Sequence, residues 1–498
     1  MQLQFNKTQV QCLQTLTREV QSQELTQEIR LTDGMPDVGR VVASWGQPII
    51  RGKEWRSSGM QVSGGVMTWT LYMPEDGGPV QCVEAWLPLQ MKWDFPSAER
   101  DGTICVAPLV QTVDARCLSS RKIMVRAGIS MLGEALLMQS VDVCVPGELP
   151  KDIQILQQTY PMQIPKEAGE KSFSIEADIA LSATAPALEK ILGNELRFDL
   201  RETKLVGDKL VFRGVATVHL RYLGTDGQLH SWDLDVPFSQ YADLDGEHEE
   251  NAEVRICFAI TGAELEECAE ENLTLKANVI GQYTVYDRYM AQLAVDAYSA
   301  VRKTETQMDA LNLPAVLAMT QHPVDLEKTL ETECVFCTDA AIYPDHPRLY
   351  RENGKLWAQL SGTVQLLGYD ANSQLCANTV RWDMDYDLGA SSDAGGMLQL
   401  GPAGATVSMG PGSANVQATL PMCVITTRES DIPMLTGLEI GEATEPDPNR
   451  PGVILRRAGD QSLWELAKKF GSTVDAIQAA NGLQQEPESD QMLLIPVL

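Results

Sequence analysis

The residue combinations that carry out catalysis in the common enzyme classes are missing from this sequence. It has no Gly-x-Ser-x-Gly nucleophile motif, no glycine-rich phosphate loop ending in Lys-Ser/Thr, no dinucleotide-binding glycine pattern and no His-Glu-x-x-His metalloprotease motif. His248-Glu-Glu250 begins like the last of these but lacks the second histidine. Five histidines in 498 residues also leave few general bases. We therefore expect that the protein is not an enzyme and uses no cofactor.

The closest approach to a metal-binding pattern is the pair Cys334 and Cys337. A structural zinc site needs four ligands, and the sequence offers neither a second CxxC nor a His pair, only His346 nearby. A zinc site here is the weaker alternative, and we expect no metal. The eleven cysteines are odd in number and scattered, and Cys105 and Cys257 lie in apolar strand patterns. We interpret the cysteines as reduced, mostly buried thiols.

Charge excludes one class of partner. The net charge of −29 and a pI near 4.5 argue against DNA, RNA or anionic lipid, because repulsion from phosphate would oppose every contact. Between Asp243 and Glu271 there are eleven acidic residues and only Arg255 to offset them. This run predicts a solvated face, with a docking surface for a basic partner as the alternative.

The N-terminal residues MQLQFNKTQVQCLQTLTREV lack the apolar stretch that a signal peptide needs. No later run approaches eighteen apolar residues, so no membrane insertion is expected. The sequence therefore predicts a protein that stays in the cytoplasm.

The elements that would position any site come from an internal repeat of about 150 residues. Each copy has a proline, a glycine 28 residues later and a tyrosine 8 residues after the glycine. These residues are Pro36, Gly64 and Tyr72 in the first copy, and Pro186, Gly214 and Tyr222 in the second. A tryptophan follows in each copy, Trp86 and Trp232. The segment after each proline, ending at Val42 and Leu192, is expected to be a short helix.

A third, degenerate copy follows near residue 330. Gly362 lies 148 residues after Gly214, Tyr369 follows it by 7, and Trp382-Asp-Met-Asp385 resembles Trp232-Asp-Leu-Asp235. The opening helix-like segment is missing, and the stretch from Gly389 to Asn415 is rich in Gly, Ala and Ser. Longer loops or weaker strands are expected there.

Within a copy the apolar pattern has period two, as in residues 210–222. One face of that segment is apolar and includes Leu210, Phe212 and Tyr222, while the other carries Arg213 and His219. This alternation predicts half-buried antiparallel strands, and several strands per copy predict a β-sandwich-like domain. We interpret His219 as a solvent-facing strand residue rather than a catalytic or metal group. The recurring Trp and Tyr residues are interpreted as core.

The C-terminal 44 residues, 453–496, predict a strand, two short helices and a strand, after an extended linker rich in Pro, Gly and Glu. Ser462 and Glu465 form a capping box before the apolar stripe of the first helix. Gly471 ends that helix, and Asn481-Gly482 ends the second. Met492-Leu-Leu-Ile495 is the closing strand.

This unit resembles a LysM domain in Gly459-Asp460-x-Ser462-Leu463-Trp464, in Asn481-Gly482-Leu483 and in Leu494-Ile495-Pro496. In that family the loops after the first strand and after the second helix form a shallow groove for N-acetylglucosamine-containing glycans. The resemblance implies a glycan- or partner-binding groove made of Gly459, Asp460, Ser462, Leu463, Asn481, Gly482 and Leu483. Two positions differ from the family pattern, because Gln461 is inserted in the first loop and Asp490 replaces the glycine before the closing strand.

The repeats resemble SPOCS domains (the DUF3794 family) in Pro36-Asp-x-x-Arg40-Val-Val42, in the glycine-to-tyrosine strand and in Val236-Pro-Phe238. Tandem SPOCS repeats before one LysM domain are the arrangement of SipL-type spore coat morphogenetic proteins. The resemblance implies SPOCS-like β repeats at 1–165 and 166–310, a degenerate one at 325–436, a linker at 437–452 and a LysM domain at 453–498. The expected fold class is mainly β with a small α+β module.

What the resemblance implies about function is a non-enzymatic scaffold or adaptor in spore coat assembly. It would be made in the mother cell and located at the forespore surface, with the LysM module docking the ATPase-type scaffold protein of the coat. The alternative is a cell-wall protein that binds peptidoglycan or N-acetylglucosamine oligomers.

Overall fold

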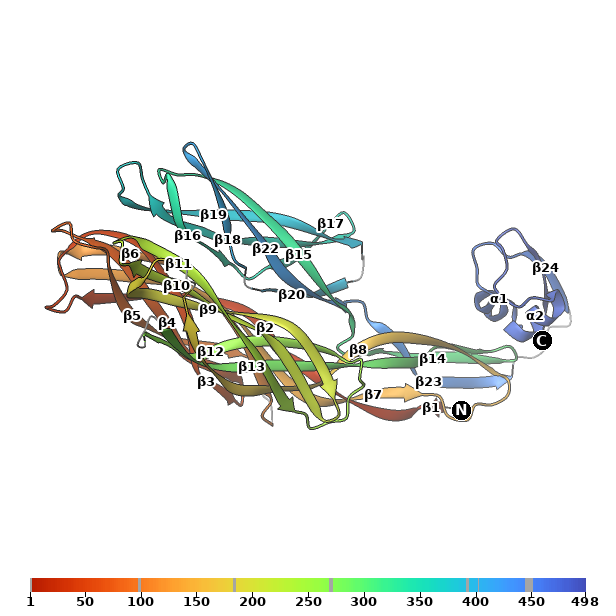
Figure 1. Ribbon diagram of the computed structural model, residues 1–498. Helices are drawn as coiled ribbons and strands as arrows, with labels where there is room; N and C mark the ends of the chain where they lie inside the picture. Colours follow the sequence, from red (N-terminus) through yellow and green to blue (C-terminus); the bar gives the residue numbers. More distant parts are fainter. Residues whose placement is uncertain are drawn as a thin grey trace.

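The computed structural model of this chain describes residues 2–96, 100–181, 185–267, 272–390, 394–401, 403–443 and 451–498. Most of these residues belong to antiparallel strands, and the described part contains two short helices near the C-terminus (Figure 1). The expected fold class, mainly β with a small α+β module, is confirmed.

The first repeat is a sandwich of two three-stranded sheets. One sheet has the order β2-β7-β6 and the other β3-β4-β5. The strands are β2 (Asn6–Arg30), β3 (Val38–Arg56), β4 (Gly59–Pro74), β5 (Gln81–Asp94), β6 (Thr103–Ser119) and β7 (Lys122–Val145). Alternate residues of both sheets, such as Val62, Leu87 and Val125, are fully buried between them. This is the core that the period of two predicts.

The second repeat has the same strand plan, with β8-β13-β12 on one side and the sheet β9-β10-β11 on the other. The pair Gln163–Val316 joins β8 to β15 of the third repeat, so that β8-β13-β12 belongs to a seven-stranded sheet. Its strands are β8 (Ile153–Ala180), β9 (Leu188–Val206), β10 (Lys209–Gly224), β11 (Leu229–Asp243), β12 (Glu253–Glu267) and β13 (Asn272–Ser299). Leu210, Phe212 and Tyr222 are buried in its core, as the alternation predicts. The internal repeat is therefore a repeat of topology as well as of spacing.

The third repeat follows the same plan with two of its strands divided. β15 (Val316–Glu331) pairs with β22 (Ser413–Arg428), whose other edge carries β20 (Ala394–Leu400) and β21 (Thr406–Gly410). In the facing sheet, β18 (Lys355–Tyr369) pairs with β19 (Leu375–Ala390) on one side, and with β16 (Phe336–Pro344) and β17 (Arg348–Glu352) on the other. The Gly-, Ala- and Ser-rich stretch at 389–415 coincides with the division into β20 and β21.

A fourth core, which the sequence did not reveal, lies between the ends of the long strands and a small additional sheet. That sheet has the order β1-β23-β14, made of β1 (Gln2–Gln4), β14 (Arg302–Leu311) and β23 (Ile432–Ala443). It packs on the extended ends of β2, β7, β8 and β13, with Cys144, Ile164, Leu293 and Leu438 buried between the layers. Figure 1 shows these strands projecting beyond the repeats toward the C-terminal module.

The repeated glycines and tyrosines have specific structural reasons. A Cβ atom added at Gly64, Gly214 or Gly362 would lie well under 3.0 Å from a carbonyl oxygen of the neighbouring strand, at the same place in each repeat. The hydroxyls of Tyr72 and Tyr222 donate hydrogen bonds of 3.1 Å to the carbonyls of Pro36 and Pro186. The spacings seen in the sequence therefore preserve a close strand approach and a buried hydrogen bond.

The helix expected after Pro36 and Pro186 is wrong, because both segments begin strands, β3 and β9. Val41 pairs with Tyr72 and Ile191 with Tyr222 across the ladder. β-Branched side chains and pairing with the neighbouring strand favour a strand here more than the apolar spacing of these short segments favours a helix.

The interpretation of His219 as a solvent-facing residue is also wrong, because the third repeat covers that face of β10. His219 Nδ1 lies 2.5 Å from Asp233 Oδ1, and its Nε2 lies 2.8 Å from Asp339 Oδ1. Arg221, fully buried, donates to Asp339 Oδ2 at 2.5 Å and to Glu195 Oε2 at 2.6 Å. Charged residues on the outward face of one repeat thus form the buried junction with another.

The interpretation of all cysteines as reduced thiols needs one correction. Cys334 and Cys376 form a disulfide between the start of the third repeat and β19. In the part of the chain that the structure describes, the remaining cysteines are free, and most of them are buried or half-buried. Cys268 lies outside the described residues, as does the end of the acidic run at 268–271.

The predicted linker at 437–452 begins inside β23, which continues to Ala443. Residues 444–450 lie outside the described residues. The long strand β8 crosses the expected boundary at 165 and 166 without a break. The second repeat therefore begins with β8 at Ile153, before the expected boundary.

Candidate binding site on the C-terminal module

The C-terminal module has the βααβ order that the sequence predicts. β24 (Val453–Arg457) pairs antiparallel with β25 (Met492–Pro496), and between them lie α1 (Leu463–Phe470) and α2 (Val474–Asn481). Ser462 and Glu465 form the capping box, while Gly471 and Gly482 end the helices in the left-handed conformation. Each cap satisfies backbone groups that a helix end would leave unpaired, which explains how so short a segment is specified locally.

The predicted groove residues fall into an exposed set and a structural set. Gly459, Asp460 and Gly482 are exposed at the two loops, and Ser462 and Leu483 are half-buried. Leu463 belongs to the core of the module. Gly459 is left-handed, with φ of 65°, whereas Asp490 is not among the described residues with positive φ. The aspartate therefore replaces the family's glycine without backbone strain.

The side chain of Asn481 is used entirely within the module. Its Nδ2 donates to the carbonyls of Ile477 at 2.8 Å and Leu494 at 2.6 Å, and its Oδ1 accepts the amide of Leu494 at 2.7 Å. Asn481 thus fastens the end of α2 to β25. None of these polar atoms is left to bind a ligand in the described structure.

A carboxylate joins the two loops that would form the groove. Glu486, in the loop after α2, accepts a hydrogen bond of 2.9 Å from the backbone amide of Leu463 at the start of α1. An acidic group near a helix N-terminus is stabilised by the helix dipole. The inserted Gln461 lies in the first loop, and its Oε1 is buried without a hydrogen-bond partner. The hydrogen bond to Glu486 could not be predicted from the sequence, because it depends on how the two loops meet.

A second surface of the module holds it against the end of β13. The indole nitrogen of Trp464 donates to Asp296 Oδ2 at 2.8 Å, and Lys468 pairs with the same carboxylate at 2.7 Å. Tyr298 is buried in the core of the module, its ring 4.8 Å from that of Trp464. Its hydroxyl donates to the carbonyl of Ser472 at 3.0 Å, and burial raises the pKa of Tyr298 to about 12.

The outer face of the two-stranded sheet is apolar and exposed. Val453, Leu455, Met492 and Leu494 have exposed fractions of 54%, 63%, 50% and 43%. Leu455 and Leu494 lie directly opposite each other in the ladder. A sheet covered by helices on one face normally presents polar residues on the other. The sequence carried this signal, since both strands are apolar at successive positions instead of alternating with polar residues.

Two further classes of site were sought over the described ranges. They contain no group of three or more His, Cys, Asp and Glu residues that could hold a metal ion. Among them, no helix is long and apolar enough to cross a membrane.

The comparisons with known proteins agree with the resemblance seen in the sequence. The family model described as SipL, SPOCS domain matches residues 187–266, and the LysM domain model matches residues 457–496. The chain thus contains a SPOCS domain of the SipL type followed by a C-terminal LysM domain. No curated protein and no solved structure matches the chain. The two domains fit a protein associated with the spore coat or the cell wall.

Proposed function

We propose that this chain, in which a LysM domain follows SPOCS-type repeats, is a non-enzymatic scaffold in spore coat assembly. It acts in the mother cell at the forespore surface. Its LysM module docks a coat morphogenetic partner protein, the ATPase-type scaffold of the coat.

The observation that carries the proposal is the internal use of the groove's hydrogen-bonding groups. Asn481 is bound to α2 and β25, and Glu486 connects the two loops across the groove. A glycan is recognised mainly through hydrogen bonds to its hydroxyl and acetamide groups, and a site whose polar groups are already paired offers little for that purpose. Occupied polar groups therefore favour a protein partner over a sugar.

The apolar face of β24 and β25 gives that partner a surface to bind. Leu455 and Leu494 stand at its centre, and exposed Arg457 lies beside Met492 at its edge. An exposed apolar face with a charged rim is typical of a protein interface. The sheet face is exposed while Asp296 and Tyr298 hold the module, so docking on this face needs no release of the module.

The repeats support a structural role over an enzymatic one. The two buried histidines with the most charged surroundings, His219 and His248, each have both ring nitrogens bonded to carboxylates. These histidines stabilise the packing of strands, and such saturated groups have no free nitrogen for general acid or base catalysis.

A binding experiment with the full chain tests the proposal. The double variant Leu455→Asp/Leu494→Asp should lower affinity for the purified coat ATPase by at least tenfold in surface plasmon resonance. Leu118→Asp, which changes an equally exposed leucine of β6, is the matched control and should bind like the unmodified chain. Equal affinity for the unmodified chain and the double variant would contradict docking on this face.

The second candidate function is binding of peptidoglycan or N-acetylglucosamine oligomers, which the LysM match itself supports. Exposed Asp460 is the side chain of the groove best placed to test it. Saturable sedimentation with purified peptidoglycan, weakened by Asp460→Ala and unchanged by Leu455→Asp/Leu494→Asp, would favour this second function over the first.

A further inference from the structure

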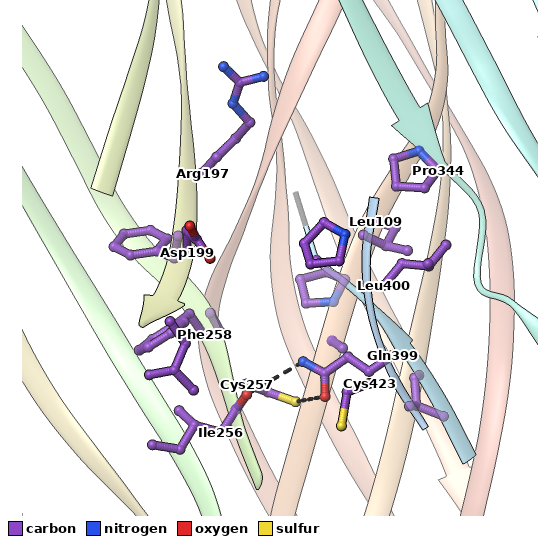
Figure 2. Close-up of a pocket in the computed structure, with 18 of the residues that line it drawn as sticks. Leu109, Arg197, Asp199, Ile256, Cys257, Phe258, Pro344, Gln399, Leu400 and Cys423 are labelled. Carbon is purple, nitrogen blue, oxygen red and sulfur yellow. Dashed lines mark hydrogen bonds between the residues drawn. The ribbon is translucent and has the colours of Figure 1, made fainter. Parts of the chain in front are cut away.

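A cavity of about 570 Å³ lies where the three repeats meet. Figure 2 shows side chains from separate strands facing one another across it. Phe258 comes from β12 of the second repeat, Leu109 from β6 of the first, and Leu400 from β20 of the third. Pockets that bind drug-sized molecules have volumes of about 300–1,000 Å³, so the size of this cavity is that of a small-molecule site.

The walls of the cavity are mainly apolar and include rings on both sides. Phe198 and Phe258 lie on the wall made by the second repeat, with ring centroids 5.3 Å apart. Opposite them are Leu109, Leu400 and the ring of Pro344 (Figure 2). Aromatic rings favour offset or edge contacts with another ring, and the flat face of a proline complements them.

The charged residues around the cavity are already paired, so they offer no net charge to a ligand. Arg197 forms two hydrogen bonds of 2.8 Å with Asp233 and a third with the carbonyl of Ala403. Asp199 pairs with Arg201 at 2.7 Å. A charged ligand would therefore lose water without gaining an opposite charge.

The polar groups deeper in the cavity differ in whether they form hydrogen bonds within the protein. The thiol of Cys257 donates to Gln399 Oε1 at 3.1 Å, and Gln399 Nε2 donates to the carbonyl of Ile256 (Figure 2). His346 also lines the cavity, but its Nε2 is buried beneath the surface and has no hydrogen-bond partner. Burial lowers the pKa of His346 to about 4, so its ring is neutral at pH 7 and adds no charge to the cavity.

We propose that this cavity binds a neutral, mainly apolar small molecule that carries an aromatic ring. The ring lies between the Phe198–Phe258 wall and the wall of Leu109, Leu400 and Pro344. Because all three repeats line the cavity, the ligand stabilises their junction by binding the assembled form. This site is independent of the LysM module and of the function proposed for it.

The test is isothermal titration calorimetry of the full chain with 1-naphthol, a two-ring probe with one hydroxyl. Saturable 1:1 binding is expected, with a higher apparent melting temperature. Leu400→Trp fills the cavity and should lower the affinity at least tenfold.

Controls separate this site from general apolar binding. Leu455→Asp removes part of the exposed LysM face and should leave 1-naphthol binding unchanged. If Leu400→Trp does not give a native circular dichroism spectrum, Leu109→Trp fills the cavity from the opposite wall. Absence of saturable binding, or binding that persists in a folded cavity-filling variant, overturns the proposal. Stronger binding of decanoate than of 1-naphthol overturns the assignment of a ring-containing ligand.

Discussion

Asp339 is the residue on which the junction of the repeats depends most, and we expect its replacement to be among the most destabilising in the chain. Its carboxylate, nearly fully buried in the third repeat, bonds both Arg221 and His219 of the second. Arg221 in turn lies over the ring of Trp45 in the first repeat, 4.3 Å from its centroid. Burial alone would raise the pKa of Asp339, but the attraction of Arg221 and His219 outweighs it and holds that pKa well below its usual range.

The magnitude follows from what Asp339→Asn removes. The amide keeps the volume of the side chain but removes the carboxylate that Arg221 and His219 share, so that Arg221 keeps Glu195 and His219 keeps Asp233 as the remaining acidic partner. Breaking a buried ion pair on one side costs about 3–5 kcal/mol, because the remaining charge stays desolvated. This corresponds to roughly two to four orders of magnitude in the unfolding equilibrium of the junction.

Urea unfolding with tryptophan fluorescence is the assay, because Trp45 lies in the junction. Hydrogen exchange of β10 and β16 provides a second measurement that does not assume a single cooperative transition. We expect the first fluorescence transition of Asp339→Asn to move to lower urea, with faster exchange in both strands. A change below about 1 kcal/mol for Asp339→Asn would refute the reasoning about the loss of this buried counter-charge.

Four further predictions concern other contacts. Tyr222→Phe removes a buried hydrogen bond and should lower the free energy of unfolding by about 0.5–1.5 kcal/mol in urea titrations, and a larger loss would point to altered ring packing. Cys376→Ser opens a disulfide that spans 42 residues, and the chain-entropy relation gives a loss of about 4 kcal/mol. Equal stability of the unmodified chain with and without reductant would contradict that expectation. Asp296→Ala removes the shared acceptor of Trp464 and Lys468, so hydrogen exchange in α1 should become faster while the repeats stay unchanged. His219 has a pKa raised above its ordinary value, because the attraction of Asp339 and Asp233 outweighs the opposing effect of burial. Protonated His219 therefore contributes its full stabilisation below about pH 6.5. That stabilisation is lost as the pH rises through the pKa of the folded state. Urea midpoints from pH 6 to 9 in the unmodified chain and in His219→Gln measure this effect, which should be absent in the variant.

The sequence by itself determined the C-terminal module and the repeat of the sandwiches. Capping at Ser462, Glu465 and Gly471 acts over a few residues, so a local reading is sufficient to place the helices. The glycine and tyrosine spacings could be recognised because each has one geometric cause within its own repeat. The glycine allows a close approach of two strands, and the tyrosine donates a hydrogen bond to a proline carbonyl. Period-two alternation likewise identified which face of each strand packs against the facing sheet of its own repeat.

Only the tertiary structure decided what covers the outward face of each strand, which points away from the core of its own repeat. An alternating strand looks the same whether its polar side meets water or a neighbouring repeat, so the sequence could not show that His219 and Arg221 are buried. For the same reason the sequence could not reveal three other contacts. They are the Cys334–Cys376 disulfide, the hydrogen bond from α1 to Glu486, and the packing of the LysM module on Tyr298. Each joins residues that local patterns treat separately, and their proximity is set by how whole sheets pack.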